Sequence, residues 1–220
     1  MILTAQGLRK EVSSGDSVLV ILDDINFSLE EGKSLAITGP SGSGKSTLLG
    51  LLAGLDTPTS GDIYLDGINL NNLNEEERAI LRKDKVGFVF QSFELLPSLT
   101  ALENVMLPSE LKSEDDPKLL GEYFLERVGL IERKNHYPNQ LSGGEQQRVA
   151  IARAFACSAK ILFADEPTGN LDPKNGKLIS DLLFEVNSES DNALVIVTHD
   201  QDLAALCDKK IELKLGKIVD

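Results

Sequence analysis

The stretch SLAITGPSGSGKSTLL, residues 34–49, decides the fold. It begins with a short apolar run, residues 34–38, which predicts a buried strand. GPSGSGKST, residues 39–47, follows with three glycines, and residues 45–54 then have the composition of a helix that ends near Gly54. The stretch therefore predicts a strand, a glycine-rich loop and a helix in direct succession.

The loop satisfies the pattern G-x-x-x-x-G-K-[ST], and its place between a strand and a helix makes that pattern informative. Its glycines allow the backbone to curl so that several N–H groups point at phosphate oxygens. Lys45 can reach the β- and γ-phosphates of a nucleotide, and the Ser46 hydroxyl can hold Mg²⁺. We predict that the whole loop binds the phosphates: Gly39, Pro40, Ser41, Gly42, Ser43, Gly44, Lys45, Ser46 and Thr47.

The rest of the chain predicts an α/β fold. Apolar or alternating runs bounded by turn residues predict strands at 2–8, 18–22, 24–29, 86–90, 161–164 and 193–198. Asp66-Gly67 lies between two short apolar runs and predicts a hairpin over residues 60–70, and Gly216 predicts a final hairpin over 211–219. Asn74 with Glu77 predicts the start of a helix.

The middle of the chain, about residues 92–156, has helical spacing and few β-branched runs. We interpret it as an inserted helical subdomain. The catalytic core then comprises residues 1–91 and 157–220, and the 220 residues form one domain.

Polar residues follow several of the apolar strands directly. Asp165 and Glu166 come after 161–164, where the first could hold a metal and the second could orient or deprotonate a water. His199 follows 193–198, and Gln91 follows 86–90. An isolated Asp-Glu pair is usually only solvated and a lone histidine is more often structural, but the ends of parallel strands are where α/β folds place ligands.

A second candidate for phosphate binding is LSGGEQQR, residues 141–148. Ser142 suits an N-cap, and the two glycines after it keep the first helical turn open to a ligand. Taken alone, LSGG is more simply a capped helix with a tight entrance. A helix start in the helical subdomain is poorly placed to serve the chain's own phosphate loop, so we predict that it completes the site of a second copy.

In order, the chain contains GPSGSGKST, Gln91, LSGGEQ, ILFADEP, GNLD and VTHD. This combination resembles the ATP-binding subunit of ABC transporters over essentially the whole chain. LLGLLAGLDTPTSGDI, GFVFQSF, LTALENVMLP and DEPTGNLD resemble the branch that serves lipoprotein release and macrolide export, and LRKEV, FVFQSF and ARAFA are most similar to its YbbA-type ATPase.

The resemblance implies an ATPase with a RecA-like P-loop core, a parallel sheet, an N-terminal antiparallel β subdomain and the inserted helical subdomain. ATP and Mg²⁺ would be its cofactors, with Ser46, Gln91 and Asp165 near the metal, and Glu166, Gln91 and His199 in catalysis. The signature residues that meet the partner's ATP would be Leu141, Ser142, Gly143, Gly144, Glu145 and Gln146. Asp172 would lie in the D-loop that links the two sites.

The same resemblance implies the partners. A second copy would close an ATP-dependent homodimer, and an integral-membrane permease would contact residues 94–105 and bind the cargo. The protein would then lie in the cytoplasm on the inner face of the cell membrane. One departure concerns the aromatic residue that family members often stack on adenine, because Val12 occupies that position here. The aromatic stacking that favours ATP over GTP in the family is therefore not expected from this position.

Composition narrows the function classes. The net charge is −13, with 35 acidic and 22 basic residues, which argues weakly against a nucleic-acid partner. Cys157 and Cys207 lack the spacing of a metal site, and no apolar run approaches a membrane span or a signal peptide. The alternative is a soluble ABC-type ATPase of DNA repair or translation, but such proteins usually carry coiled coils, zinc modules or tandem domains. A P-loop kinase or GTPase would lack LSGGEQ.

Overall fold

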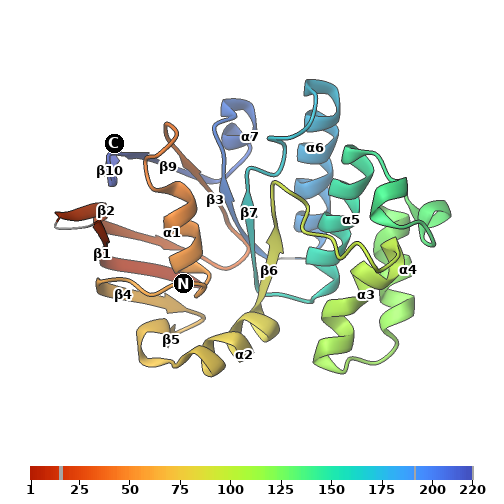
Figure 1. The fold of residues 1–220 in the computed structure, drawn as a ribbon, viewed down its shortest axis with the longest axis horizontal. Helices are drawn as coiled ribbons and strands as arrows, with labels where there is room; N and C mark the ends of the chain where they lie inside the picture. The colour runs from red at the N-terminus through yellow and green to blue at the C-terminus, as the bar shows by residue number, and fades with distance from the viewer. Residues whose placement is uncertain (15–16, 191, 220) are drawn as a thin grey trace. The chain divides into compact units, whose positions relative to one another are not determined.

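The computed structural model describes residues 1–14, 17–190 and 192–219 (Figure 1). The chain divides into two compact units. The first contains Met1–Arg82 and Ala193–Asp220, and the second contains Lys83–Asn192. Each unit has its own strands and helices.

The first unit contains an antiparallel sheet with the order β2-β1-β4-β5. Its strands are β1 (Leu3–Ser14), β2 (Ser17–Leu29), β4 (Ser60–Leu65) and β5 (Ile68–Asn69). Asp66 and Gly67 both have positive φ, 49° and 75°, as a tight β4–β5 turn with the right-handed twist of its strands requires. The predicted hairpin is therefore present, and the predicted strands at 18–22 and 24–29 belong to one longer strand, β2.

Parallel strands form the other part of the first unit. β3 (Ser34–Thr38) is buried along its whole length and pairs in parallel with β8 (Ala193–Val197) and with β9 (Lys209–Lys214). β10 (Lys217–Val219) adds an antiparallel edge to β9, which is the predicted final hairpin. Buried leucines of α1 (Lys45–Leu52) face the interior directly after the glycine-rich loop. The unit also contains η1 (Leu70–Asn72) and α7 (Gln201–Ala205), and α2 (Glu75–Lys85) begins in it.

Asp208 ties the start of β3 to the chain that enters β9. Its Oδ2 accepts hydrogen bonds from the Ser34 N–H at 2.9 Å and the Ser34 hydroxyl at 2.7 Å, and its Oδ1 accepts one from the Lys33 ammonium at 3.1 Å. These bonds, that of the Ser34 N–H above all, lower the pKa of the Asp208 carboxyl to about 2. A charged Asp208 therefore stabilises the join between two strands that are far apart in sequence.

Replacing Asp208 with Asn is expected to lower the free energy of unfolding at neutral pH by about 1 kcal/mol, since the side chain is 44% exposed and solvent screens its charge. The folded-state pKa lies below the usual value of about 3.9, so the stabilisation is complete above that value and is lost as the pH falls toward 2. Denaturant unfolding of both proteins across this acid range measures the difference. A difference that does not shrink on acidification would contradict the assignment.

The second unit contains two parallel strands and most of the helices (Figure 1). β6 (Val86–Val89) pairs with β7 (Ile161–Asp165) in parallel register. The helices are α3 (Ala101–Lys112), α4 (Pro117–Arg127), η2 (Ile131–Arg133), η3 (Pro138–Gln140), α5 (Gly143–Ala156) and α6 (Pro173–Ser190). The helical character predicted for the middle of the chain is thus present.

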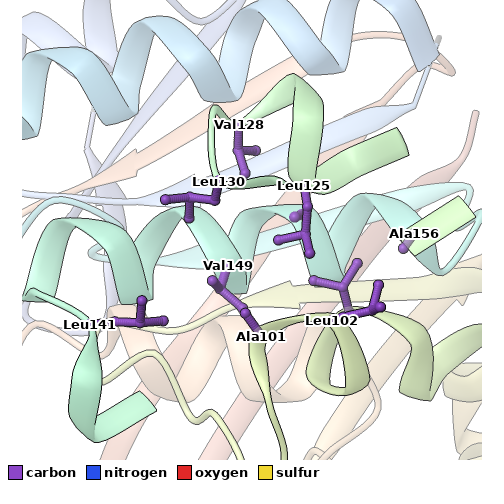
Figure 2. Packing of buried hydrophobic residues seen from close by; sticks show 10 residues of the cluster. Ala101, Leu102, Leu125, Val128, Leu130, Leu141, Val149 and Ala156 are labelled. Carbon is purple, nitrogen blue, oxygen red and sulfur yellow. The ribbon is translucent and has the colours of Figure 1, made fainter. Parts of the chain in front are cut away.

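Helices α3, α4 and α5 share one apolar core. Figure 2 shows Leu102 of α3 and Leu125 of α4 converging, with Val149 of α5 beside Ala101. All four side chains are at least nine-tenths buried. Burying each of the larger ones, the leucines and the valine, stabilises the unit by about 1.5–3 kcal/mol. Leu141 and Val149 belong to this core, which therefore fixes the segment 141–148 at the start of α5. Among the described residues no helix has the length and apolar character that crossing a membrane requires.

Candidate functional site

The glycine-rich loop packs tightly against its neighbours in the first unit. Gly39 has a φ of 141°, and a Cβ on it would lie 2.1 Å from the Leu213 carbonyl oxygen. Gly44 has a φ of 103° at the N-cap of α1, and its Cβ would lie 2.8 Å from the Leu22 side chain. Both positions exclude a side chain, because φ is positive and neighbouring atoms occupy the space. The loop can therefore only have this curled form with glycine at these two places.

Two polar side chains of the loop fit a phosphate group. The Ser43 hydroxyl is buried at 4% exposure and makes no hydrogen bond within the described part of the chain. The Lys45 ammonium folds back over the loop and donates to the carbonyls of Gly39 at 2.9 Å and Pro40 at 3.1 Å. A buried hydroxyl without a partner costs free energy unless a ligand satisfies it. The curled backbone, the hydroxyl and the lysine together suit an anion.

His199 lies just beyond the end of β8, in the same unit as the loop. Thr198 before it is buried, and its N–H donates to the Ile37 carbonyl of β3 at 3.1 Å. Asp200 after it caps α7 and accepts hydrogen bonds from the N–H groups of Asp202 and Leu203. The His199 backbone is thus held on both sides, while the side chain itself is exposed.

In the second unit, Asp165 ends β7 and Glu166 begins a tight turn. Glu166 has a φ of 46°, and its carbonyl accepts a hydrogen bond from the Gly169 N–H at 3.0 Å. Within this turn, the Pro167 carbonyl accepts a hydrogen bond at 2.7 Å from Gln147, a fully buried side chain of α5. The turn that begins at Glu166, directly after Asp165, is therefore fixed to the helix that begins at Gly143.

Ser142 and Glu145 form a reciprocal capping box at the start of α5. The Ser142 hydroxyl accepts from the Glu145 N–H, and the Glu145 carboxylate accepts from the Ser142 N–H and hydroxyl, both at 2.8 Å. These bonds, the backbone N–H first, hold the pKa of the Glu145 carboxyl below its ordinary value. Leu141 packs into the helical core, and Gln146 donates to its carbonyl. The predicted N-cap is confirmed.

Asp172 caps α6 within its own chain. Its Oδ1 accepts from the N–H groups of Lys174 and Asn175, and its Oδ2 accepts from the Asn175 side chain at 2.6 Å. The bonds from Asn175 lower the pKa of the Asp172 carboxyl most. A Cβ on Gly144 would lie 3.5 Å from the Asn175 amide carbon, so the first turns of α5 and α6 are neighbours.

Gln91 is paired with Asn170, which sequence reasoning did not single out. Asn170 Nδ2 donates to the Gln91 carbonyl at 2.8 Å, and Gln91 Nε2 donates to Asn170 Oδ1 at 3.3 Å. Asn170 belongs to the GNLD segment, in which only Asp172 has a predicted role. The contact spans 79 residues, so no local pattern predicts it.

The predicted site residues are thus divided between the units. The first contains residues 39–47 and His199, and the second contains Gln91, residues 141–146, Asp165, Glu166 and Asp172. Ser46, Gln91 and Asp165 offer hydroxyl, amide and carboxylate oxygens, the donor types that Mg²⁺ prefers. Within the described residues, no group of three or more His, Cys, Asp or Glu side chains could hold a metal.

The position expected to meet the base is aliphatic. Val12 of β1 pairs with Leu19 of β2, and their side chains are 47% and 55% exposed. Leu22, further along β2, lies against the Gly44 position of the phosphate loop. The hairpin that adjoins the loop therefore offers aliphatic surface rather than an aromatic ring.

Comparison with known proteins shows which family the chain resembles. A family model described as "ABC transporter" matches residues 22–169. The chain is 50% identical over 219 residues to "Uncharacterized ABC transporter ATP-binding protein YbbA" of Escherichia coli (strain K12), which covers 99% of this chain and 96% of that protein. It is 47% identical over 219 residues to "Lipoprotein-releasing system ATP-binding protein LolD" of Treponema denticola, covering 99% and 97% of the two chains.

Among solved structures, the dimeric post-hydrolysis state of "the ATP-binding cassette MJ0796 bound to ADP and Pi" is similar, with a TM-score of 0.92 and 42% identity. MJ0796 is a protein of Methanocaldococcus jannaschii, and the match covers 99% of this chain and 97% of that one. This similarity over nearly all of both chains confirms the predicted α/β fold of an ABC cassette. The chain therefore belongs to the ABC transporter family, as one of its ATP-binding subunits.

Proposed function

We propose that this chain is the ATP-hydrolysing motor subunit of an ABC transporter and works as a homodimer on a membrane permease. The observation that carries this proposal is the phosphate loop between β3 and α1. Its backbone is curled by glycines of positive φ, and the buried Ser43 hydroxyl has no partner among the described residues. Phosphate oxygens would accept hydrogen bonds from the N–H groups that this curled backbone presents.

In this proposal residues 39–47 bind the triphosphate, and Lys45 leaves the loop carbonyls to contact the β- and γ-phosphates. Ser46, Gln91 and Asp165 would hold Mg²⁺, which would neutralise phosphate charge when bound. Glu166 orients and deprotonates the attacking water, since a carboxylate can accept its proton. His199, held at the end of β8, contacts the γ-phosphate.

The signature residues 141–146 serve the partner subunit. α5 begins with a capped, glycine-containing turn whose N–H groups can bind phosphate, as helix N-termini do. Two copies would enclose two ATP molecules head to tail, with Asp172 in the loop that links the sites. Closure needs the γ-phosphate and opening follows its loss, which converts hydrolysis into motion. The similar MJ0796 cassette is dimeric in the structure that bears its name.

The permease would contact residues 94–105. Beside this stretch the second unit has a groove of about 300 Å³, lined mainly by apolar side chains. The lining includes Phe88, Phe90, Leu107, Pro108 and Leu111, together with Glu94 and Arg153. An apolar groove with a few charged groups suits a protein segment. The similarity to LolD supports export or lipoprotein-related transport, with the chain on the inner face of the membrane through its permease.

The alternative of a soluble ATPase in DNA repair or translation has less support. The relatives reported above are named as ATP-binding proteins of transporters or of a lipoprotein-releasing system. We also propose that the functional division of the chain follows the core at 1–91 and 157–220 and the helical subdomain at about 92–156.

Replacing Lys45 with Ala tests nucleotide binding. Loss of a charge-assisted contact to phosphate is expected to weaken ATP binding by about 1.5–3 kcal/mol, or about 10- to 150-fold in Kd. Calorimetric titration of each protein with ATP in the presence of Mg²⁺ measures the affinity for ATP. Phosphate release by the wild type measures hydrolysis.

Lys209→Ala is the matched control, because Lys209 also donates to a backbone carbonyl, that of Ser28, in the first unit. It should leave the ATP affinity unchanged. An unchanged Kd in Lys45→Ala would contradict the assignment of the phosphate loop, and a wild type that releases no phosphate would contradict the proposed function.

A further inference from the structure

Asn170 holds residue 91 by two hydrogen bonds of different kinds. The shorter, at 2.8 Å, runs from Asn170 Nδ2 to the Gln91 backbone carbonyl and fixes the position of the residue. The longer, at 3.3 Å, runs from Gln91 Nε2 to Asn170 Oδ1 and selects the direction of the side chain. One asparagine thus controls both the backbone and the side chain of Gln91.

Gly169 makes this pairing possible. A Cβ at this position would lie 2.9 Å from Gln91 Nε2 and 3.3 Å from Gln91 Cδ, so the glutamine amide lies directly over the glycine. The turn that presents Gly169 and Asn170 begins at Glu166, whose carbonyl accepts the Gly169 N–H. Gln91 is therefore held by the loop that begins with the proposed catalytic carboxylate.

The segment just after Gln91 is also fixed. Phe93 and Glu94 have positive φ values of 62° and 49°, and both of their carbonyls accept hydrogen bonds from Arg153 of α5. The Phe93 ring comes within 3.7 Å of the place where a Gly143 Cβ would lie. Because the backbone is tied on both sides, the remaining freedom of Gln91 is that of its side-chain torsions.

Those torsions are where Asn170 acts. A glutamine side chain loses considerable rotamer entropy when it is confined to one orientation. If the free enzyme already confines it, this entropy loss does not add to the activation free energy of the reaction. Asn170 is itself exposed, and both polar atoms of its side-chain amide are engaged with residue 91. The contact also links Gln91 to the loop of Asp172, two residues further on.

We propose that Asn170 is a positioning residue that orients Gln91 for ATP hydrolysis and makes Gln91 move together with the D-loop. This inference rests on the proposed function, since it assigns a supporting role to one of its catalytic groups. Asn170 binds no substrate itself, and so its loss should affect turnover without affecting nucleotide affinity.

The experiment measures steady-state ATP hydrolysis by the full-length protein across ATP and Mg²⁺ concentrations. Asn170→Ala is expected to lower kcat about tenfold with an unchanged KM for ATP, and to raise the Mg²⁺ concentration needed for half-maximal rate. Gly169→Ala leaves Asn170 in place but pushes the Gln91 amide aside, and it should reproduce this pattern. Asn71→Ala is the control, because that asparagine also donates to a carbonyl, of Gly61 at 2.7 Å, outside the site.

A double-mutant cycle separates positioning from a general structural role. Because Asn170 is proposed to act through the Gln91 side chain, Gln91→Ala/Asn170→Ala should be no slower than Gln91→Ala alone. An additional tenfold loss in the double variant would overturn the proposal, as would a wild-type kcat in Asn170→Ala. If Asn170→Ala does not fold, a wild-type kcat in Gly169→Ala overturns it equally.

The same series distinguishes this proposal from the proposed function. Normal wild-type turnover with unaffected Asn170→Ala and Gly169→Ala overturns only the positioning role. A wild type without ATP turnover overturns both.

Discussion

Replacing Glu166 with Gln is expected to lower ATP turnover by about 10²- to 10⁴-fold while leaving ATP binding intact. The amide has the size of the carboxylate but cannot accept a proton from the attacking water. In the proposed mechanism the replacement also removes a charge close to the γ-phosphate, so the ATP-bound state should persist. The variant should therefore accumulate as a dimer in ATP and Mg²⁺, which light scattering after gel filtration detects.

Glu77→Gln is the matched control, because Gln serves as well as Glu in the capping box that Glu77 closes with Asn74 at the start of α2, outside every proposed site. It should turn over ATP normally and form no trapped dimer. A Glu166→Gln protein that stayed monomeric in ATP would contradict the sandwich dimer, and one that hydrolysed ATP at the wild-type rate would contradict the role of Glu166.

Replacing Gly143 with Ala is expected to lower ATP turnover by about 10²- to 10³-fold while sparing both folding and ATP binding. In its own chain a Cβ at Gly143 would make only ordinary contacts, 3.7 Å from Phe93 and 4.0 Å from Leu171. Alanine is also the better helix former at this first position of α5. Nothing in the described part of the chain therefore requires glycine there, and a need for it must come from a ligand that approaches the backbone N–H.

If that ligand is the γ-phosphate held by the partner subunit, the added methyl group blocks it. Loss of such backbone donors costs about 10²- to 10³-fold in rate at comparable sites. ATP titration, thermal unfolding and phosphate release together define the result. Ser142→Ala is less decisive, because Ser142 also caps α5 and its loss would destabilise the helix by about 1 kcal/mol.

Gly50→Ala is the control for Gly143→Ala. It also introduces alanine within a helix, α1, where a Cβ would have no neighbour within 4 Å. Both variants should unfold at or slightly above the wild-type temperature, and only Gly143→Ala should lose turnover. Normal turnover in Gly143→Ala would contradict a role for the signature helix in the partner's site.

Short-range features were the most predictable from the sequence. The strand, loop and helix around residues 39–47 follow from glycines and an apolar run within a few positions. The Asp66-Gly67 hairpin and the cap at Asn74, whose side chain accepts from the Glu77 N–H at 3.0 Å, are equally local. Each depends on backbone conformations and hydrogen bonds between near neighbours, which a short pattern encodes completely.

Long-range pairings were not predictable in this way. The final hairpin was predicted, but not that β9 would pair in parallel with β3, more than 170 residues away. The Asp208–Ser34 bonds and the pairing of Gln91 with Asn170 span 174 and 79 residues. Such contacts depend on how distant segments pack. The residues next to an asparagine or aspartate in the sequence do not determine whether it makes a contact of this kind.

The sequence by itself therefore determined the phosphate loop, the α/β class and the family of this protein, because each rests on short motifs or runs whose own residues are close together in the chain. Only the tertiary structure decided that the Ser43 hydroxyl is buried without a partner among the described residues, that Gly143 has room for a methyl group, and that Asn170 holds Gln91. The physical reason is that burial, free space and hydrogen bonding between distant residues exist only once the whole chain has packed.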